Sequence, residues 1–162
     1  MSTVPHLPVL RLGRNYESLD KFEVKDHKTG EVKALVSNVN AGIVRRDLSK
    51  LGGARAALKK FTVAQLMELS AKAGELFLNG TLPLGDQGHT QSPQQYIETL
   101  SGTSGLPWNM VQRNMAKIHF ALTNMKFVLN GLSRGLDLGI LDNGTGEQFG
   151  TKLSYFPISL LY

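Results

Sequence analysis

The chain has 162 residues, of which 41% are hydrophobic, and it contains no cysteine. A chain of this length buries one moderate core, and the lack of thiols excludes disulfides, thiolate metal ligands and a cysteine nucleophile. The formal net charge of +5 permits attraction to phosphate. The cations are scattered, however, with few aromatic residues between them for base stacking, so nucleic acid is not the favoured partner.

No apolar run reaches the length of a membrane span, or of a signal peptide with its cleavage site. We therefore expect a cytoplasmic protein without a membrane partner. The histidines lie far apart, and none has a second His, Asp or Glu at the spacing of a metal motif. They are His6, His27, His89 and His119. The sequence therefore predicts no metal-binding residue.

Residues 1–19 contain two prolines, a glycine and no clear periodicity, so we expect an extended arm and not a core element. From Lys21 the pattern changes to apolar residues that alternate with charges. These apolar residues are Phe22, Val24, Val32, Ala34 and Val36. Residues 26–30 supply turn chemistry between the two runs, with Gly30 suited to a positive φ. The pattern predicts a β-hairpin.

Helical segments follow the hairpin. Asn38 or Asn40 can cap a helix that begins near Ala41, and the pair Gly52-Gly53 loosens or breaks it before a second helical segment over 54–61. Thr62 is a suitable N-cap for a third helix, which Gly80 ends. Its apolar face consists of Leu66, Leu69, Ala73, Leu76 and Phe77. Residues 81–92 are rich in Gly, Pro and polar side chains, which predicts an exposed loop.

Ser92-Pro93 opens a short helix, which the sequence SGTSG at 101–105 ends. The clearest helix then extends over 107–133, with apolar residues at alternating spacings of three and four. They are Trp108, Val111, Met115, Ile118, Leu122, Met125, Leu129 and Leu132. Packing of this seam in the core is favoured over a partner helix. Five glycines between 135 and 150 disfavour a helix. We expect a loop there that leads to a strand over 153–156.

Few residues suggest chemistry. Asn143-Gly144-Thr145-Gly146 with Gly150 resembles a phosphate loop, but the flanking strand, helix and lysine of that motif are absent. Two carboxylate pairs have the residue types of an acid and a base, yet solvated surface carboxylates explain them better. These pairs are Glu17 with Asp20, and Glu68 with Glu75. Trp108 is either a binding platform or a core anchor, and its place at the head of the apolar seam favours the core.

An ordered series of motifs resembles the start of the aldehyde dehydrogenase superfamily, over residues 20 to 157. The series is Thr29-Gly30-Glu31 in the hairpin turn, Ala54-Arg55-Ala56 in a helix, Leu69 with Ala73 and Leu76 in the next helix, and Ser101 to Pro107 before the longest helix. The segments SGTSGLPWNMVQRNM and GLDLGILDNGTGEQFGTKLSYFP are also similar to a branch related to acyl-CoA reductases. Departures are Asp26-His27-Lys28, where Asn-Pro-x is common, and Gln65, where arginine is usual.

The resemblance implies a nicotinamide-binding α/β domain, a catalytic domain and an oligomerisation hairpin. NAD or NADP is implied for the intact family enzyme, whose cysteine nucleophile, oxyanion donor and glutamate would lie after residue 162. Pro107-Trp108-Asn109 looks like a family element that supplies an oxyanion donor, but it occurs too early in the order, so Asn109 is read as a helix-start residue. We therefore assign this chain no catalytic or cofactor-binding residue and expect it to bind no cofactor alone.

The sequence thus predicts an α+β fragment in two parts, an extended arm over 1–19 and the N-terminal segment of an aldehyde-dehydrogenase-like domain over 20–162. A hairpin and a mainly helical layer would form the second part. The chain alone would be inert and would expose apolar surface along 111–132, which favours self-association or binding to the remainder of an enzyme. The alternative is a small basic helical module that binds nucleic acid or an acidic protein through Arg45, Arg46, Arg113 and Lys117.

Overall fold

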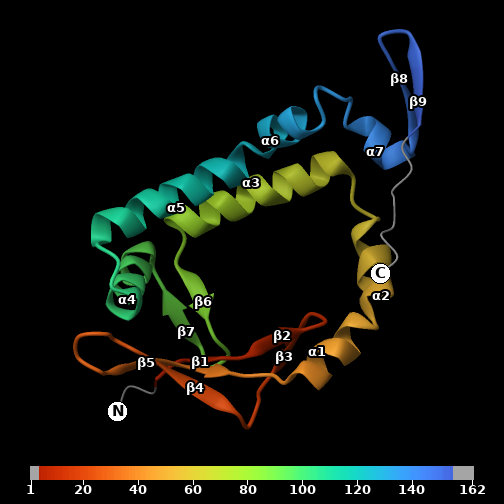
Figure 1. The fold of residues 1–162 in the computed structure, drawn as a ribbon. Helices are drawn as coiled ribbons and strands as arrows, with labels where there is room; N and C mark the ends of the chain where they lie inside the picture. The colour runs from red at the N-terminus through yellow and green to blue at the C-terminus, as the bar shows by residue number, and fades with distance from the viewer. Residues whose placement is uncertain (1–3, 155–162) are drawn as a thin grey trace.

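The computed structural model describes residues 4–154 and shows a mixed α+β chain (Figure 1). Its strands are β1 His6–Leu7, β2 Val9–Arg11, β3 Arg14–Tyr16, β4 Lys21–Lys25, β5 Val32–Ser37, β6 Leu82–Leu84, β7 His89–Gln91, β8 Thr145–Gln148 and β9 Thr151–Ser154. Its helices are α1 Ala41–Leu48, α2 Leu51–Leu58, α3 Val63–Asn79, α4 Pro93–Ser104, α5 Trp108–Thr123, α6 Met125–Leu132 and α7 Gly139–Asn143. Within the described residues, no helix combines the length and apolar character needed to cross a bilayer.

The predicted hairpin is confirmed as β4 and β5, which pair antiparallel in a three-stranded sheet of order β1-β5-β4. Asp26 organises the turn, because its Oδ1 accepts hydrogen bonds from the backbone N–H groups of Lys28 and Thr29 at 2.9 and 3.0 Å. Gly30 has φ +72°, a conformation that glycine adopts without the steric cost of a Cβ. Local turn chemistry therefore fixes this element.

The N-terminal arm differs from the expectation. It is extended, but β1 pairs in parallel with β5, with His6 opposite Leu35, and so joins the sheet. β2 and β3 form a separate antiparallel hairpin with a turn at Leu12 and Gly13. A strand of two residues that pairs with a distant segment leaves no periodicity in its own sequence, which is why the arm gave no sign of a core element.

The helices over 41–80 follow their local signals. Asn40 caps α1 by accepting the Ile43 N–H, and Thr62 forms a capping box with Gln65 at the start of α3, which ends before Gly80 as predicted. The break between α1 and α2 is at Ser49-Lys50, and the pair Gly52-Gly53 lies inside α2. The Ser49 hydroxyl donates to the Arg46 carbonyl, and such side-chain bonds compete with helix continuation.

The segment 81–92 is a hairpin of β6 and β7, so the prediction of a loop over these residues was wrong. Gly85 and Gly88, at φ +71° and +76°, make the reversal possible. The glycine-rich segment after 134 likewise contains α7 and the hairpin β8–β9. Of the strand predicted over 153–156, residues 153 and 154 belong to β9, and 155 and 156 lie outside the described residues.

The expected helix over 107–133 is divided into α5 and α6 at Asn124. The Asn124 side chain donates to the Phe120 carbonyl and the Thr123 hydroxyl donates to the His119 carbonyl, each at 2.9 Å. Side chains that bond carbonyls of the preceding turn bend helices. α4 begins at the Ser92 cap as predicted, and Gly105 ends it in the left-handed conformation.

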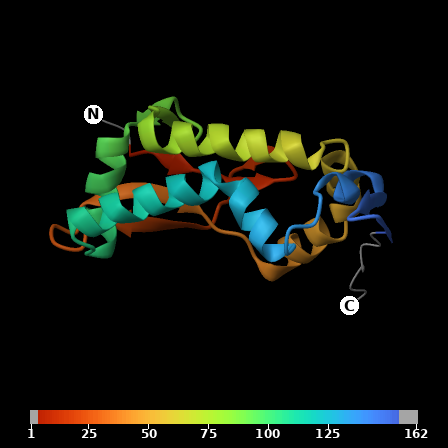
Figure 2. The same cartoon turned by 90° about the horizontal axis from the view of Figure 1, so that it is seen from above.

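The core lies between α3, α4 and α5, where Ile97, Val111 and Met115 are buried against Phe77 and Tyr96. α3 and α5 lie side by side in Figures 1 and 2, and the Ser70 hydroxyl on α3 donates to the Leu122 carbonyl on α5. Core packing of the apolar seam is therefore confirmed for its first half. The second half is less covered, since Leu132 is 78% exposed.

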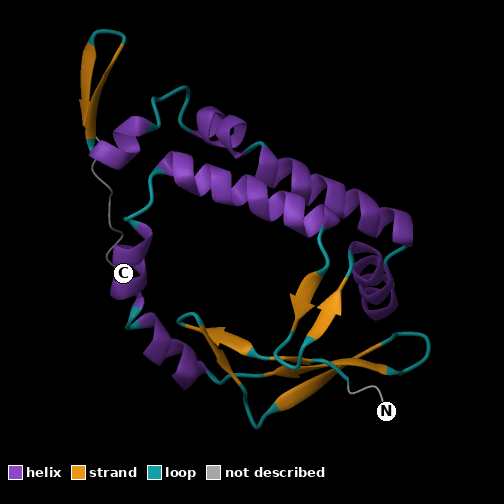
Figure 3. Cartoon of the chain, turned by 180° about the vertical axis from the view of Figure 1, so that it is seen from behind, coloured by secondary structure: helices purple, strands orange, loops and turns teal. Residues whose placement is uncertain are grey.

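The elements are arranged around an open frame (Figure 3). The sheet forms one side, and the pair α3 and α5 forms the opposite side. The hairpin β6–β7 and α4 connect the two sides at one end, and α1 and α2 connect them at the other. Neither α1 nor α2 has a buried residue, so this second connection has little packing of its own.

Candidate functional site

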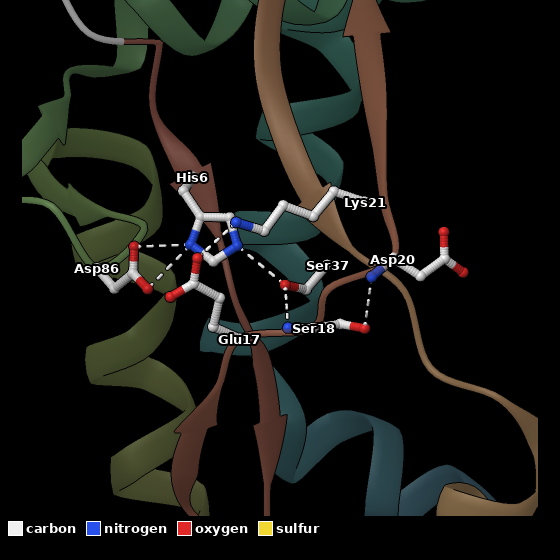
Figure 4. A network of polar contacts seen from close by, with 7 residues as sticks. All are labelled: His6, Glu17, Ser18, Asp20, Lys21, Ser37 and Asp86. Atoms are coloured by element: carbon white, nitrogen blue, oxygen red, sulfur yellow. Dashed lines mark hydrogen bonds and ion pairs between the residues drawn. The ribbon is translucent and has the colours of Figure 1, made fainter.

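A buried histidine connects the arm, the sheet and the β6–β7 turn (Figure 4). His6 lies on β1 and Ser37 ends β5, and the turn after β6 brings Asp86 to the ring. The turn reaches this position only because residue 85 is glycine, since a Cβ there would lie 2.0 Å from the His6 carbonyl oxygen. The Asp86 N–H also donates to that oxygen at 3.3 Å.

The contacts of His6 determine which ring nitrogen is protonated. Both carboxylate oxygens of Asp86 lie 3.0 Å from Nδ1, and because a carboxylate only accepts, Nδ1 carries the proton. Nε2 lies 2.9 Å from the Ser37 hydroxyl and, in the neutral ring with the proton on Nδ1, accepts from it. The same hydroxyl oxygen accepts the Ser18 N–H at 2.9 Å. Every polar atom of the ring and of Ser37 thus has a partner.

An ion pair lies beside the ring. Lys21 at the start of β4 donates to Glu17, four residues earlier (Figure 4). The hydrogen bond and the positive charge of Lys21 lower the pKa of Glu17, and His6 adds a smaller effect in the same direction. Glu17 is therefore ionised at neutral pH and is unsuited to act as a general acid.

The hydrogen bonds connect Ser37 to His6 and His6 to Asp86. The same arrangement connects a serine nucleophile, its base and the residue that orients the base. Attack on a substrate requires an accessible hydroxyl, but Ser37 is only 4% exposed and His6 only 2%. The one backbone N–H near the serine is directed at its own oxygen and not at a site for an oxyanion. The geometry therefore describes a structural connection that fixes β1 and the β6–β7 turn on the sheet.

A cleft of about 360 Å³ lies between the sheet and α4. Leu7, Ala34, Tyr96 and Leu100 contribute to a mainly apolar lining. Its one cation, Lys33, donates to Glu31, and this hydrogen bond raises the pKa of Lys33. The ammonium is thereby retained, so Lys33 offers neither an amine nucleophile nor a base.

The carboxylates considered in the sequence are not brought together as acid and base. Asp20 accepts from the Asn38 side chain. Glu75 on α3 accepts from or pairs with His119 on α5 at 2.8 Å, and Glu68 lies elsewhere on the same helix. Within residues 4–154, no three His, Asp or Glu side chains are placed to hold a metal ion.

The remaining sequence candidates are also separated by the fold. Residues 143–146 end α7 and begin β8, and Gly150 lies in the hairpin turn, so they form no phosphate loop. Trp108 is 49% exposed, and the prediction of a core anchor was wrong because α5 turns its first residue outward. Asn109 lies in the first turn of α5, as predicted.

The basic residues of the alternative hypothesis lie on different helices. Arg45 and Arg46 belong to α1, whereas Arg113 and Lys117 belong to α5, and the two helices are far apart in Figures 1 and 2. They form no common surface. No protein-family model, no curated protein and no solved structure matches the chain.

The His6 connection was missed by sequence reasoning. Its members are 31 and 80 positions apart in the chain, so no local spacing joins them. The indication that was available is the dipeptide Gly85-Asp86 after an apolar pair, which is typical of a tight turn between strands. A hairpin at that position would have directed attention to the acid at its turn.

Proposed function

We propose that this chain is the N-terminal region of an aldehyde-dehydrogenase-like oxidoreductase and that it contributes structure and assembly, not bond making. The observation that carries the proposal is the uncovered apolar surface at the α5–α6 junction. Phe120 and Leu132 are strongly exposed, and Phe127 is 79% exposed. Exposed apolar side chains on two consecutive helices are typical of a region that another protein segment covers.

Two of the motifs lie in elements of the type that the proposal expects, whereas the third is partly helical, because Ser101 to Ser104 end α4. Gly30 lies in the turn of the β4–β5 hairpin, Arg55 lies in α2, and Ser101 to Pro107 precedes α5. Leu69 and Leu76 on α3 are exposed. In the family reading, the remaining domains would cover this face of α3.

The chemistry of the family requires groups that this chain lacks. The sequence has no cysteine to attack a carbonyl, and the buried Ser37 is no substitute. NAD or NADP would be bound by the intact enzyme, with aldehydes or acyl-CoA thioesters as substrates. The partner of the isolated chain is therefore a second copy or the remainder of such an enzyme.

The apolar surface gives the first test. The double variant Phe127→Ser with Leu132→Ser should reduce self-association in light scattering and lower the fluorescence of a hydrophobic dye, because it removes the two most exposed apolar side chains of α6. Leu19→Ser is the matched control, since Leu19 is fully exposed but isolated from this surface. A monodisperse, dye-silent wild-type chain would contradict the proposal.

Identity is tested by the coding sequence that follows the codon for Tyr162. We expect a frame that encodes a glycine-rich βαβ unit and then a cysteine among glycines. The purified chain alone should not oxidise aldehydes or reduce acyl-CoA thioesters with either nicotinamide. Turnover by the chain itself, or the lack of such a frame, would overturn the assignment.

A further inference from the structure

The net charge of the molecule is concentrated in one exposed segment. Residues 45–60, the basic segment, hold six cations and one acid, which leaves +5, the formal net charge of the whole chain. The cations are Arg45, Arg46, Lys50, Arg55, Lys59 and Lys60. All six are exposed, and none forms an ion pair with another of the described residues. The single acid, Asp47, is already paired with Arg11.

Beside this segment, the β2–β3 hairpin presents apolar side chains to solvent. Leu10 is 75% exposed and Leu12 is 51% exposed. Leu12 occupies the turn with φ +49°, followed by Gly13 at +79°. Such a turn favours Asn or Asp before the glycine, and a bulky residue there is strained. An exposed leucine in this position stabilises neither the turn nor the core, which is the pattern of a residue retained for contact with a partner.

An ion pair connects the β2–β3 hairpin to α1. The Arg11 guanidinium donates to both carboxylate oxygens of Asp47, at 2.6 and 2.7 Å, and lies 4.7 Å from the centre of the Tyr16 ring. A groove of about 280 Å³ lies between the two elements. Leu10, Leu12, Val44, Leu48 and Leu51 are among the residues that line it. The apolar side chains of the hairpin thus lie next to the start of the basic segment.

We propose that this surface, the hairpin tip with the basic segment, binds the face of an anionic lipid bilayer, with Leu10 and Leu12 entering the interface. Short basic helices with exposed apolar residues bind bilayers in this way, since cations meet acidic headgroups while apolar side chains leave water. Nucleic acid would use the cations but not the leucines. A second copy would bring the same positive charge against itself.

Flotation with vesicles of phosphatidylcholine containing one third phosphatidylserine tests the proposal. Leu12→Asn should weaken binding roughly tenfold by removing an inserted side chain, without loss of folding, because asparagine suits the turn. Phe149→Asn is the matched control. Phe149 is a fully exposed residue at φ +52° in the β8–β9 turn, which lies away from the basic segment.

The charge is tested separately by Arg45→Gln, Arg46→Gln and Lys50→Gln combined, which should weaken binding roughly a hundredfold. This variant keeps the proposal testable if Leu12→Asn fails to fold by circular dichroism. Binding to phosphatidylserine vesicles that both changes weaken and Phe149→Asn leaves unchanged supports the proposal. Three results overturn it: equal binding to neutral vesicles, preferential binding to duplex DNA or RNA, or a dimer that Leu12→Asn dissociates.

Discussion

The helices α2 and α5 show how differently one chain can use apolar residues. In α5, Val111 and Met115 are buried against α3 and α4, and the helix is part of the core. In α2, Leu51 and Leu58 are exposed and no residue is buried. Both helices have apolar residues at helical spacing, so the spacing defines a face but does not provide the element that covers it. The α3–α4–α5 region therefore has a core of its own, whereas the α1–α2 connection has none.

The largest effect is expected from removing a core side chain. Met115→Ala should lower the free energy of unfolding by about 3 kcal/mol through lost burial and a cavity. Met110→Ala in the same helix is the control, because Met110 is about half-exposed, and its effect should stay within about 0.5 kcal/mol. Urea titration of both variants measures the difference. Equal losses would mean that α5 is not packed as described.

The next effect concerns the turn that holds Asp86 against His6. Gly85→Ala places a Cβ against the His6 carbonyl in addition to the cost of its positive φ, so we expect a loss of about 3 kcal/mol. Gly88→Ala has the same φ cost but open space around the Cβ, and it should lose about 1 kcal/mol. Thermal unfolding separates the two. A larger loss for Gly88→Ala would contradict the close approach of the turn to β1.

Replacing one glycine by alanine in each region should change the stability in opposite directions. Gly74→Ala in α3 brings a Cβ within 3.0 Å of the Leu122 Cβ and should destabilise by about 1 kcal/mol. Gly52→Ala in α2 meets nothing within 4 Å and should stabilise that helix by about 0.8 kcal/mol. Hydrogen exchange of the two helices measures each change locally. Destabilisation by Gly52→Ala would show that α2 is covered in solution.

The smallest effect is the pH dependence of the connection between the arm and α1. The hydrogen bonds and charge of Arg11 lower the pKa of Asp47, so the folded state gains stability above the unfolded pKa of about 4. This gain is lost as the pH falls through the lowered pKa. Asp47→Asn should therefore flatten the loss of stability below about pH 4 in urea titrations. If Asp47→Asn left the pH dependence of stability unchanged, the Arg11–Asp47 ion pair would not contribute to it.

Elements with their own boundary residues were predictable from sequence. Asn40 and Thr62 cap helices, and Gly30 closes a turn, because each acts on backbone groups within a few positions. The strand β1 was not predictable in this way, since its pairing partner lies in a distant segment. Pro83 also argued against a strand at β6, because proline cannot donate a backbone hydrogen bond, although an edge strand accepts it.

The same distinction applies to the site. The residues around His6 come from three separate segments, and only the folded chain shows that Asp86 and Ser37 contact one ring. Trp108 illustrates the opposite error, because helical spacing placed it on the buried seam, whereas the beginning of α5 extends beyond the core. Tertiary contacts therefore decided both outcomes.

The exposed α1–α2 connection also has a consequence for limited proteolysis. Trypsin should cut after Arg55 or Lys59, where the residues are exposed and α2 has no buried residue. The two products would still be joined, since His6 and Asp86 lie on different products and His27 donates to the Gly102 carbonyl across the cut. The molecule should therefore persist as a two-piece complex, which makes this position a natural place to divide the chain for reassembly.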